Sequence, residues 1–164
     1  MENQNTSILD QIISNHKAEE VARLNAVEII ESLFNELNER ERDILRRRFG
    51  LSGKEKETLE RIGEAHKLTR ERIRQIEISA VKKLHQLENL ENYISGLKKV
   101  IRELLEEHGG FAERNYLLSL LVGFSADGGR AGEEEKKLHK NHLDFLISRL
   151  LRDEFEEASE SKHF

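Results

Sequence analysis

The sequence contains no proline in 164 residues, so glycine is the only strong helix-disfavouring residue type that it contains. Charged residues make up 36% of the chain and hydrophobic residues 37%, which is typical of solvated amphipathic helices around small cores. Apolar side chains recur at intervals of three and four over most of the length. We therefore predict an all-α fold, or nearly so.

Composition also excludes several classes of protein. Cysteine is absent, which excludes disulfides, thiolate zinc sites and cysteine nucleophiles and fits a reducing cytoplasm. No segment approaches the roughly 18 consecutive apolar residues of a membrane span. The N-terminus lacks the basic and apolar regions of a signal peptide. We expect a cytoplasmic protein without a membrane partner.

Charge is distributed unevenly along the chain, although the total is −5. Residues 37–88 carry 14 basic and 10 acidic side chains, whereas residues 1–36 carry 2 and 7, and residues 89–164 carry 11 and 15. Only the middle segment has the sign expected of a surface that meets phosphate. The acidic flanks argue against a nonspecific coat on DNA.

Apolar spacing predicts one or two amphipathic helices over residues 8–37, so residues 1–36 form an acidic N-terminal helical segment. Asn38 then begins a new helix, with Glu41 placed three residues later to complete a capping box. This helix runs to Phe49, where Gly50 ends it.

Two short helices with a tight turn between them follow. Thr58 is the predicted N-cap of the first, which ends near His66, and Thr69 is the predicted N-cap of the second. The turn comprises only residues 66–68. This arrangement is a helix-turn-helix, the second helix of which enters the DNA major groove in many DNA-binding proteins.

The second helix begins with the most informative stretch of the sequence, residues 69–77. With Ile73 and Ile76 facing the core, four polar tips project together from the first two turns. They belong to Arg70, Glu71, Arg74 and Gln75. Arginine can bridge guanine O6 and N7, glutamine matches adenine, and glutamate accepts from cytosine N4, so these tips suit base reading. The alternative is a solvated helix face stabilised by ion pairs.

At these positions the chain also resembles a known family. Residues 37–50, 58–63 and 68–77 place an Arg-Phe-Gly motif, a variable loop and a Thr-Arg-Glu-Arg run in one order. Over residues 37–88 this pattern resembles region 4 of bacterial sigma-70-class factors of the housekeeping type. The resemblance implies a domain that binds the promoter −35 element and docks on the flap of the RNA polymerase β subunit.

Site residues follow from the resemblance position by position. It implies base-edge contacts from Arg70, Glu71, Arg74 and Gln75. It implies DNA phosphate contacts from Arg40, Arg48, Thr58 and Leu59, the last through its backbone amide. Thr58 and Leu59 begin a helix, where exposed amides bind an anion well.

The chain departs from a complete sigma factor upstream of this domain. Recognition and melting of the −10 element need basic and aromatic side chains, which the acidic residues 1–36 cannot supply. The chain has no tryptophan and only 2 tyrosines. We therefore expect that it is not a complete initiation factor, and the abrupt end after Phe164 suggests a piece of a longer protein.

Residues 89–164 are predicted to form a C-terminal helical domain. Helices are expected over 91–108, around 116–121 and over 133–151, with a glycine-rich mobile loop over 123–132 and an extended segment over 153–161. Three helices and a terminal strand resemble an incomplete winged helix of the type found in the RNA polymerase delta subunit.

The third of these helices offers a second candidate DNA face, formed by Lys136, Lys137, Lys140 and Asn141, which would point outward. Three glutamates precede them and the whole segment is acidic, so protein docking or dimerisation is an equal alternative. Whether a homodimer forms stays open at this point.

The sequence offers no catalytic, cofactor or metal site. His139 and His142 are spaced to reach one metal ion, but no nearby carboxylate or third imidazole completes a site, so we expect exposed histidines. Glycine-rich residues 128–132 lack the lysine and hydroxyl residue of a P-loop. The carboxylates fall in solvated runs without an apolar pocket to perturb them.

These observations predict a non-enzymatic, sequence-specific DNA-binding transcription protein that contacts double-stranded −35-like promoter DNA. The alternative is an adaptor that docks on the RNA polymerase β flap or on another regulator through the same fold, with little DNA binding of its own. Steep salt dependence and sequence preference would favour the first function, and flap binding without DNA affinity the second.

Overall fold

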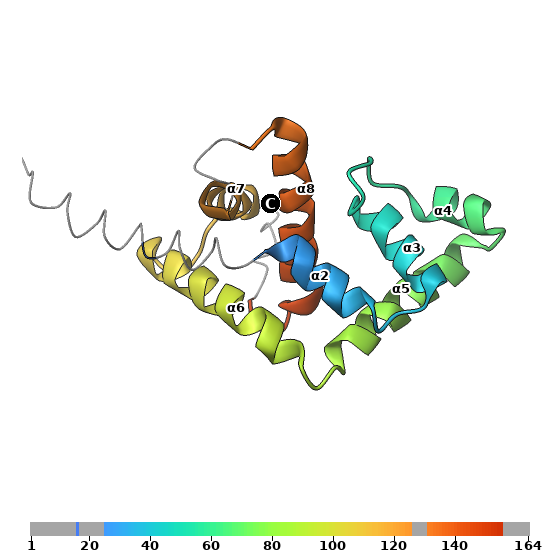
Figure 1. The fold of residues 1–164 in the computed structure, drawn as a ribbon, viewed down its shortest axis with the longest axis horizontal. Helices are drawn as coiled ribbons and strands as arrows, with labels where there is room; N and C mark the ends of the chain where they lie inside the picture. Colours follow the sequence, from blue (N-terminus) through green and yellow to red (C-terminus); the bar gives the residue numbers. More distant parts are fainter. Residues whose placement is uncertain (1–15, 17–24, 126–130, 156–164) are drawn as a thin grey trace, which may run out of the picture.

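The computed structural model describes residue 16 and residues 25–125 and 131–155, and this part of the chain is helical without any strand (Figure 1). The helices are α2 (Ala26–Phe34), α3 (Glu39–Phe49), α4 (Leu59–His66), α5 (Arg70–His85), α6 (Leu90–Glu107), α7 (Arg114–Ser125) and α8 (Glu133–Phe145), which continues into the π-helical turn η2 (Leu146–Leu150). The predicted all-α class is confirmed. Among the described helices, none combines the length and apolar character needed to cross a membrane.

The helix starts read from the sequence are confirmed for α3. The Asn38 side chain accepts a hydrogen bond from the Glu41 amide at 2.9 Å, and the Glu41 carboxylate accepts one from the Asn38 amide at 3.0 Å. At the other end Gly50 adopts the left-handed conformation with φ of 66°, which glycine reaches without a Cβ clash. The capping box and this glycine therefore set the length of α3.

Helix α2 occupies only the end of the predicted N-terminal helical stretch. Asn25 caps it by accepting hydrogen bonds from the amides of Val27 and Glu28. The part of the prediction over residues 8–24, apart from His16, lies outside the described residues.

Helices α4 and α5 form the predicted helix-turn-helix. The hydroxyl of Thr58 accepts from the Arg61 amide at 3.3 Å, and the hydroxyl of Thr69 accepts from the Arg72 amide at 3.1 Å. Ile62 and Ile73 are fully buried in a small core that the two helices share with α3. The capped starts and this core fix the angle between the helices.

The turn between α4 and α5 depends on a close backbone approach at Gly63. The Leu68 amide donates to the Gly63 carbonyl at 2.9 Å, and Lys67 adopts the left-handed conformation at the end of α4. A Cβ on Gly63 would lie 2.6 Å from the Leu68 carbonyl oxygen, which is closer than side chains tolerate. Only glycine fits this position without moving the turn.

The C-terminal region differs from prediction at two places. Helix α7 continues through Gly123 to Ser125, so the expected loop over 123–132 begins later; Leu121 and Val122 are buried in the core and hold this end of the helix in place. Residues 153–155 form a turn rather than an extended segment, because the amides of Glu154 and Phe155 both donate to the Leu151 carbonyl. Residues 156–161 of that predicted segment lie outside the described residues, as do 126–130 of the loop.

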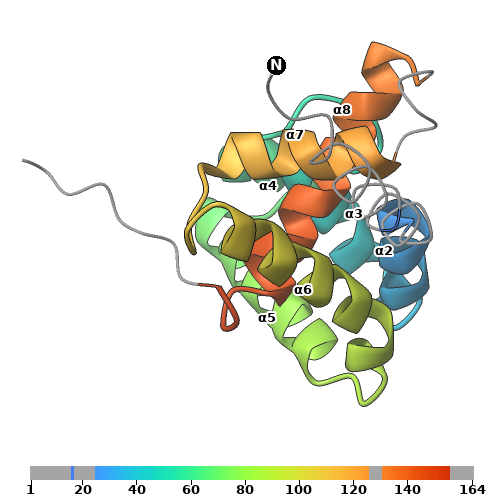
Figure 2. The same cartoon turned by 90° about the vertical axis from the view of Figure 1, so that its left-hand side faces the viewer.

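A single large core joins the helices on both sides of α8. Figures 1 and 2 show α8 lying between α7 on one side and α2 and α3 on the other, and it contacts all three. Phe145, at the end of α8, is fully buried and packs edge-on against Phe34 of α2 and Phe49 of α3, with ring centroids 5.8 and 4.9 Å apart. These three rings hold the end of α8 against α2 and α3. The three-part division of the chain itself stays a prediction.

We expect Phe145→Ala to lower the free energy of unfolding by about 3–5 kcal/mol, because it opens a cavity among buried rings. Urea denaturation followed by circular dichroism measures this change. Phe111→Ala is the matched control, since Phe111 is 78% exposed, and it should leave stability nearly unchanged. Equal effects of the two substitutions would contradict the role given to Phe145.

Gly63→Ala should lower the free energy of unfolding by about 1–3 kcal/mol, because the new methyl group overlaps the Leu68 carbonyl oxygen. Gly123→Ala supplies the control, since Gly123 lies in α7 with no atom within 4 Å of the added Cβ. This control should leave stability unchanged or raise it by up to about 1 kcal/mol. The same denaturation experiment tests both; tolerance of alanine at Gly63 would refute the close-approach account.

Candidate nucleic-acid interface

The four side chains predicted to read bases lie exposed on the first two turns of α5. Glu71 and Arg74 form a two-pronged ion pair, with Nε and Nη2 of Arg74 donating to the two carboxylate oxygens at 2.9 and 2.7 Å. The Gln75 amide donates to the same carboxylate at 3.5 Å. Three of the four predicted tips are thus in direct contact.

Hydrogen bonds from Arg74 lower the pKa of Glu71 below its ordinary value, so the carboxylate is ionised at neutral pH and acts only as an acceptor. The pair occupies two of the N–H donors of the Arg74 guanidinium and leaves the other three for a ligand. The two side chains therefore present both donors and an acceptor from a fixed geometry, which is what base edges require.

Arg70 is held differently, from the neighbouring helix. Its Nε lies 3.2 Å from the Glu60 carboxylate on the first turn of α4. Sequence reasoning missed a further contact on α5, in which Nη1 of Arg72 donates to the Gln75 side chain at 3.2 Å. The three-residue spacing of Arg72 and Gln75 on one helix was the signal for it.

Two of the residues expected to contact phosphate form the start of α4. Thr58 is exposed and caps the helix, and its hydroxyl satisfies the Arg61 amide. Leu59 is the first helical residue, so its amide has no partner within the helix and points out from the N-terminus. An amide in this position, with the helix dipole behind it, favours a bound anion.

Arg48 lies beside this helix start and is half-buried. Its Nη1 donates to the Glu57 carbonyl at 3.2 Å, one residue before Thr58, and its Nε lies 3.5 Å from the Glu77 carboxylate of α5. These contacts position the guanidinium between α3, the loop before α4, and α5. About one-third of the side chain stays exposed for a ligand.

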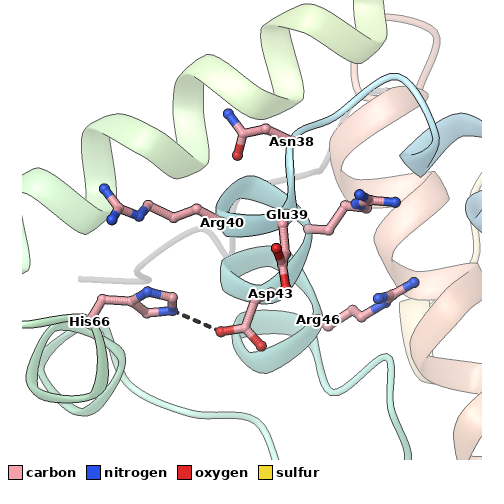
Figure 3. Close-up of a pocket in the computed structure, with 7 residues that line it drawn as sticks. Asn38, Glu39, Arg40, Asp43, Arg46 and His66 are labelled. Carbon is pink, nitrogen blue, oxygen red and sulfur yellow. Dashed lines mark hydrogen bonds and ion pairs between the residues drawn. The ribbon is translucent and has the colours of Figure 1, made fainter.

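Arg40 lines an open polar groove of about 790 Å³ beside α3 (Figure 3). The same groove contains Arg46 and the pair formed by His66 and Asp43, whose Nε2 and carboxylate oxygen are 2.7 Å apart. His66 belongs to the end of α4, so the groove joins the start of α3 to the helix-turn-helix. Arg40 projects into it from the first turn of α3.

The candidate second DNA face on α8 is only partly exposed, and the expectation for Asn141 is wrong. Asn141 is 9% exposed, because it points inward and donates to the Gly50 carbonyl at 3.1 Å. Lys137 pairs with Glu55 and Lys136 lies 3.8 Å from Glu133, so both cations are engaged by carboxylates. Lys137 and Asn141 thus contact the segment after α3, although Lys137 stays half-exposed.

The expectation of two exposed histidines is wrong for His142. His142 is 1% exposed, its Nδ1 hydrogen-bonds the Leu138 carbonyl at 2.7 Å, and burial lowers the pKa of the imidazole below its ordinary value. The residue packs inward because α8 is covered by α2 and α3. Among the described residues, no group of three potential ligands is arranged to hold a metal ion.

Comparison with known proteins gives the middle of the chain a family. Residues 33–86 match the family model described as Sigma-70, region 4, and this range contains all eight positions expected to contact bases or phosphates. Region 4 domains of sigma factors bind −35 promoter DNA and RNA polymerase, and they are not enzymes. No solved structure matches the chain.

Curated relatives match over part of the chain. The RNA polymerase sigma factor RpoD of Helicobacter pylori is 57% identical over 56 residues, which cover 34% of this chain and 8% of the relative. SigA1 of Synechococcus elongatus is 45% identical over 84 residues, 51% of this chain and 20% of the relative. SigA of Lactococcus lactis is 49% identical over 57 residues, 35% of this chain and 16% of the relative.

The match therefore spans one-fifth or less of the length of these sigma factors. The family-model match falls on the capped helices, the Gly63 turn and the exposed face of α5 described above. Residues 33–86 of this protein are a sigma-70 region 4 domain.

Proposed function

We propose that this protein binds −35-like promoter DNA in a sequence-specific manner, with the start of α5 in the major groove. The observation that supports this most directly is the exposure of Arg70, Glu71, Arg74 and Gln75 together on the first two turns of the second helix of a helix-turn-helix. The role is that of a DNA-binding transcription protein. Such a role implies a cytoplasmic location, beside the promoter DNA.

Phosphate contacts set the position of the protein on the duplex in this mechanism. The free amide of Leu59 and the hydroxyl of Thr58 bind one phosphate at the start of α4, and Arg48 binds close by from α3. Arg40 contacts the backbone from the groove beside α3. These contacts are independent of sequence and orient α5 in the groove.

Base reading then falls to the exposed face of α5. Arg74 can donate to guanine O6 and N7, while Glu71 accepts from a cytosine N4 amino group and Gln75 pairs with adenine. The existing ion pair between Glu71 and Arg74 orders both side chains before DNA arrives, which reduces the conformational entropy lost on binding. Arg70, held by Glu60, completes the face.

A second candidate function is an adaptor that docks on the RNA polymerase β flap with little DNA binding of its own. The acid excess of residues 1–36 and 89–164 favours it, because these segments repel a polyanion and leave only the middle of the chain attractive to DNA. Region 4 domains of sigma factors bind RNA polymerase as well as DNA, so the same fold serves either function.

Replacing Arg74 tests the base-reading role. We expect Arg74→Ala to weaken binding to a duplex with the −35 hexamer of housekeeping promoters by about 1–3 kcal/mol. Binding to a scrambled duplex should weaken much less. Fluorescence anisotropy at two salt concentrations measures both affinities. Arg102→Ala on α6 is the matched control, since Arg102 pairs with Glu154 away from α5.

The outcome separates the two candidate functions. Preference of the wild-type protein for the hexamer, lost in Arg74→Ala and kept in Arg102→Ala, supports sequence-specific DNA binding. Equal or undetectable binding of both duplexes would refute it. Tight binding to the isolated β flap with no DNA affinity would establish the adaptor function instead.

A further inference from the structure

A cleft with an unusual concentration of positive charge lies where the C-terminal helices meet the region 4 domain. It has a volume of about 410 Å³ and opens between α3, the loop before α4, the start of α7 and η2. Five basic side chains line it, namely Arg48, Lys56, Arg114, Arg149 and Arg152. We call these five residues and the space between them the basic cleft.

Two largely buried carboxylates position four of the five cations. Asp144 accepts from Nε of Arg114 at 2.8 Å and lies 3.4 Å from the Lys56 ammonium group. Glu77 lies 3.5 Å from Nε of Arg48 and 3.7 Å from Nη2 of Arg149. Each carboxylate is thus shared by two cations, so the cleft keeps a surplus of positive charge.

The surplus is concentrated at Arg149 and Arg152. Nε of Arg149 is buried without a hydrogen-bond partner among the described residues, and its guanidinium lies 5.1 Å from the centre of the Phe49 ring. Arg152 is exposed and has no ion pair within the described part of the chain. Arg152 therefore offers N–H donors to an anionic ligand, and Arg149 offers those in the exposed third of its side chain, whereas its Nε is too buried to reach a ligand.

The five cations of the cleft repel one another. They therefore stabilise the fold less than they would if they were far apart on the surface. The surrounding segment makes the concentration more notable, since residues 89–164 carry 15 acidic and 11 basic side chains. A surface on which cations repel one another attracts a ligand of negative charge.

The place of the cleft identifies the ligand. Arg48 lines the cleft and also donates to the Glu57 carbonyl, immediately before the Thr58 and Leu59 positions where α4 offers its start to a phosphate. The basic cleft is therefore continuous with the expected phosphate contacts of the region 4 domain. Its cations come from separate elements along an open surface, which suits an extended polyanion better than a small ion.

We propose that the basic cleft binds the phosphate backbone of the same duplex that α5 reads, on the flank of the contacted hexamer. The inference rests on the proposed function and extends it, because it gives the C-terminal helices a share in DNA binding. Phe145 packs against Phe34 and Phe49 and so holds η2 beside Arg48. The region 4 domain alone lacks Arg114, Arg149 and Arg152, so on this account it binds DNA more weakly than the full chain does.

The test uses Arg152→Ala, because this exposed side chain has no contact that the fold depends on among the described residues. One lost phosphate contact reduces the slope of log K against log salt by about 0.9, which is roughly an eightfold loss of affinity at 0.1 M salt. Lys56→Ala is the second variant, since Asp144 keeps Arg114 as a partner. Arg102→Ala on α6 is the control for loss of a surface arginine.

We expect Arg152→Ala and Lys56→Ala to weaken binding to the hexamer duplex and to the scrambled duplex by the same factor. The preference for the hexamer should stay intact. Two shortened duplexes, one trimmed at each end of the hexamer, locate the contact. Trimming one end should abolish the difference between wild-type protein and Arg152→Ala, and trimming the other should preserve it. Thermal melts followed by circular dichroism check that the variants fold.

The outcomes distinguish this inference from the function on which it rests. A wild-type protein that binds no duplex refutes the proposed function and the inference together. A wild-type protein that prefers the hexamer, with affinity and salt slope unchanged in both cleft variants, overturns the inference alone. Cleft variants that bind DNA as the wild-type protein does but lose its binding to a poly-glutamate probe would also overturn the inference. That result would assign the cleft to an acidic protein partner.

Discussion

The packing of Phe145 between Phe34 and Phe49 is the interaction on which the arrangement of this protein depends. It joins the end of α8 to α2 and α3, and through them it fixes the C-terminal helices against the region 4 domain. Together with the ion pairs of Arg48 and Arg149 to Glu77, it places Arg149 beside Arg48. This hydrophobic contact therefore helps to assemble the basic cleft from helices that are distant in the sequence.

The exposed face of α5 that carries Arg70, Glu71, Arg74 and Gln75 depends on short-range interactions. Thr58 and Thr69 cap the two helices, and the approach of Leu68 to Gly63 makes the turn between them tight. The exposed start of α5 then carries charge in an ordered form, since Glu71 and Arg74 hold each other in place. Local backbone chemistry provides the geometry of the proposed DNA-binding face, and the ion pair between Glu71 and Arg74 provides its pattern of donors and acceptors.

Sequence reasoning predicted the features that are local in the chain. The capping box at Asn38 and the caps of α4 and α5 were predictable because their partners lie three residues apart. The burial of Asn141 and His142 was not predictable from the sequence. It depends on the packing of α2 and α3 over α8, and these two helices lie about a hundred residues earlier in the chain. The same applies to the basic cleft: Arg149 and Arg152 are visible as a pair in the sequence, but their nearness to Arg48 results from tertiary packing. The contacts of the candidate DNA-binding residues with DNA stay predictions.

Chemical-shift mapping by NMR tests the central claim most directly. The uniformly ¹⁵N-labelled chain is titrated with a duplex that carries the −35 hexamer, and the amide signals are followed. The account predicts shifts at the start of α4, over the first two turns of α5 and at residues of the basic cleft, with α6 unaffected. Shifts confined to α6 and α7, or none at all, would contradict the claim that this protein reads DNA through its region 4 domain.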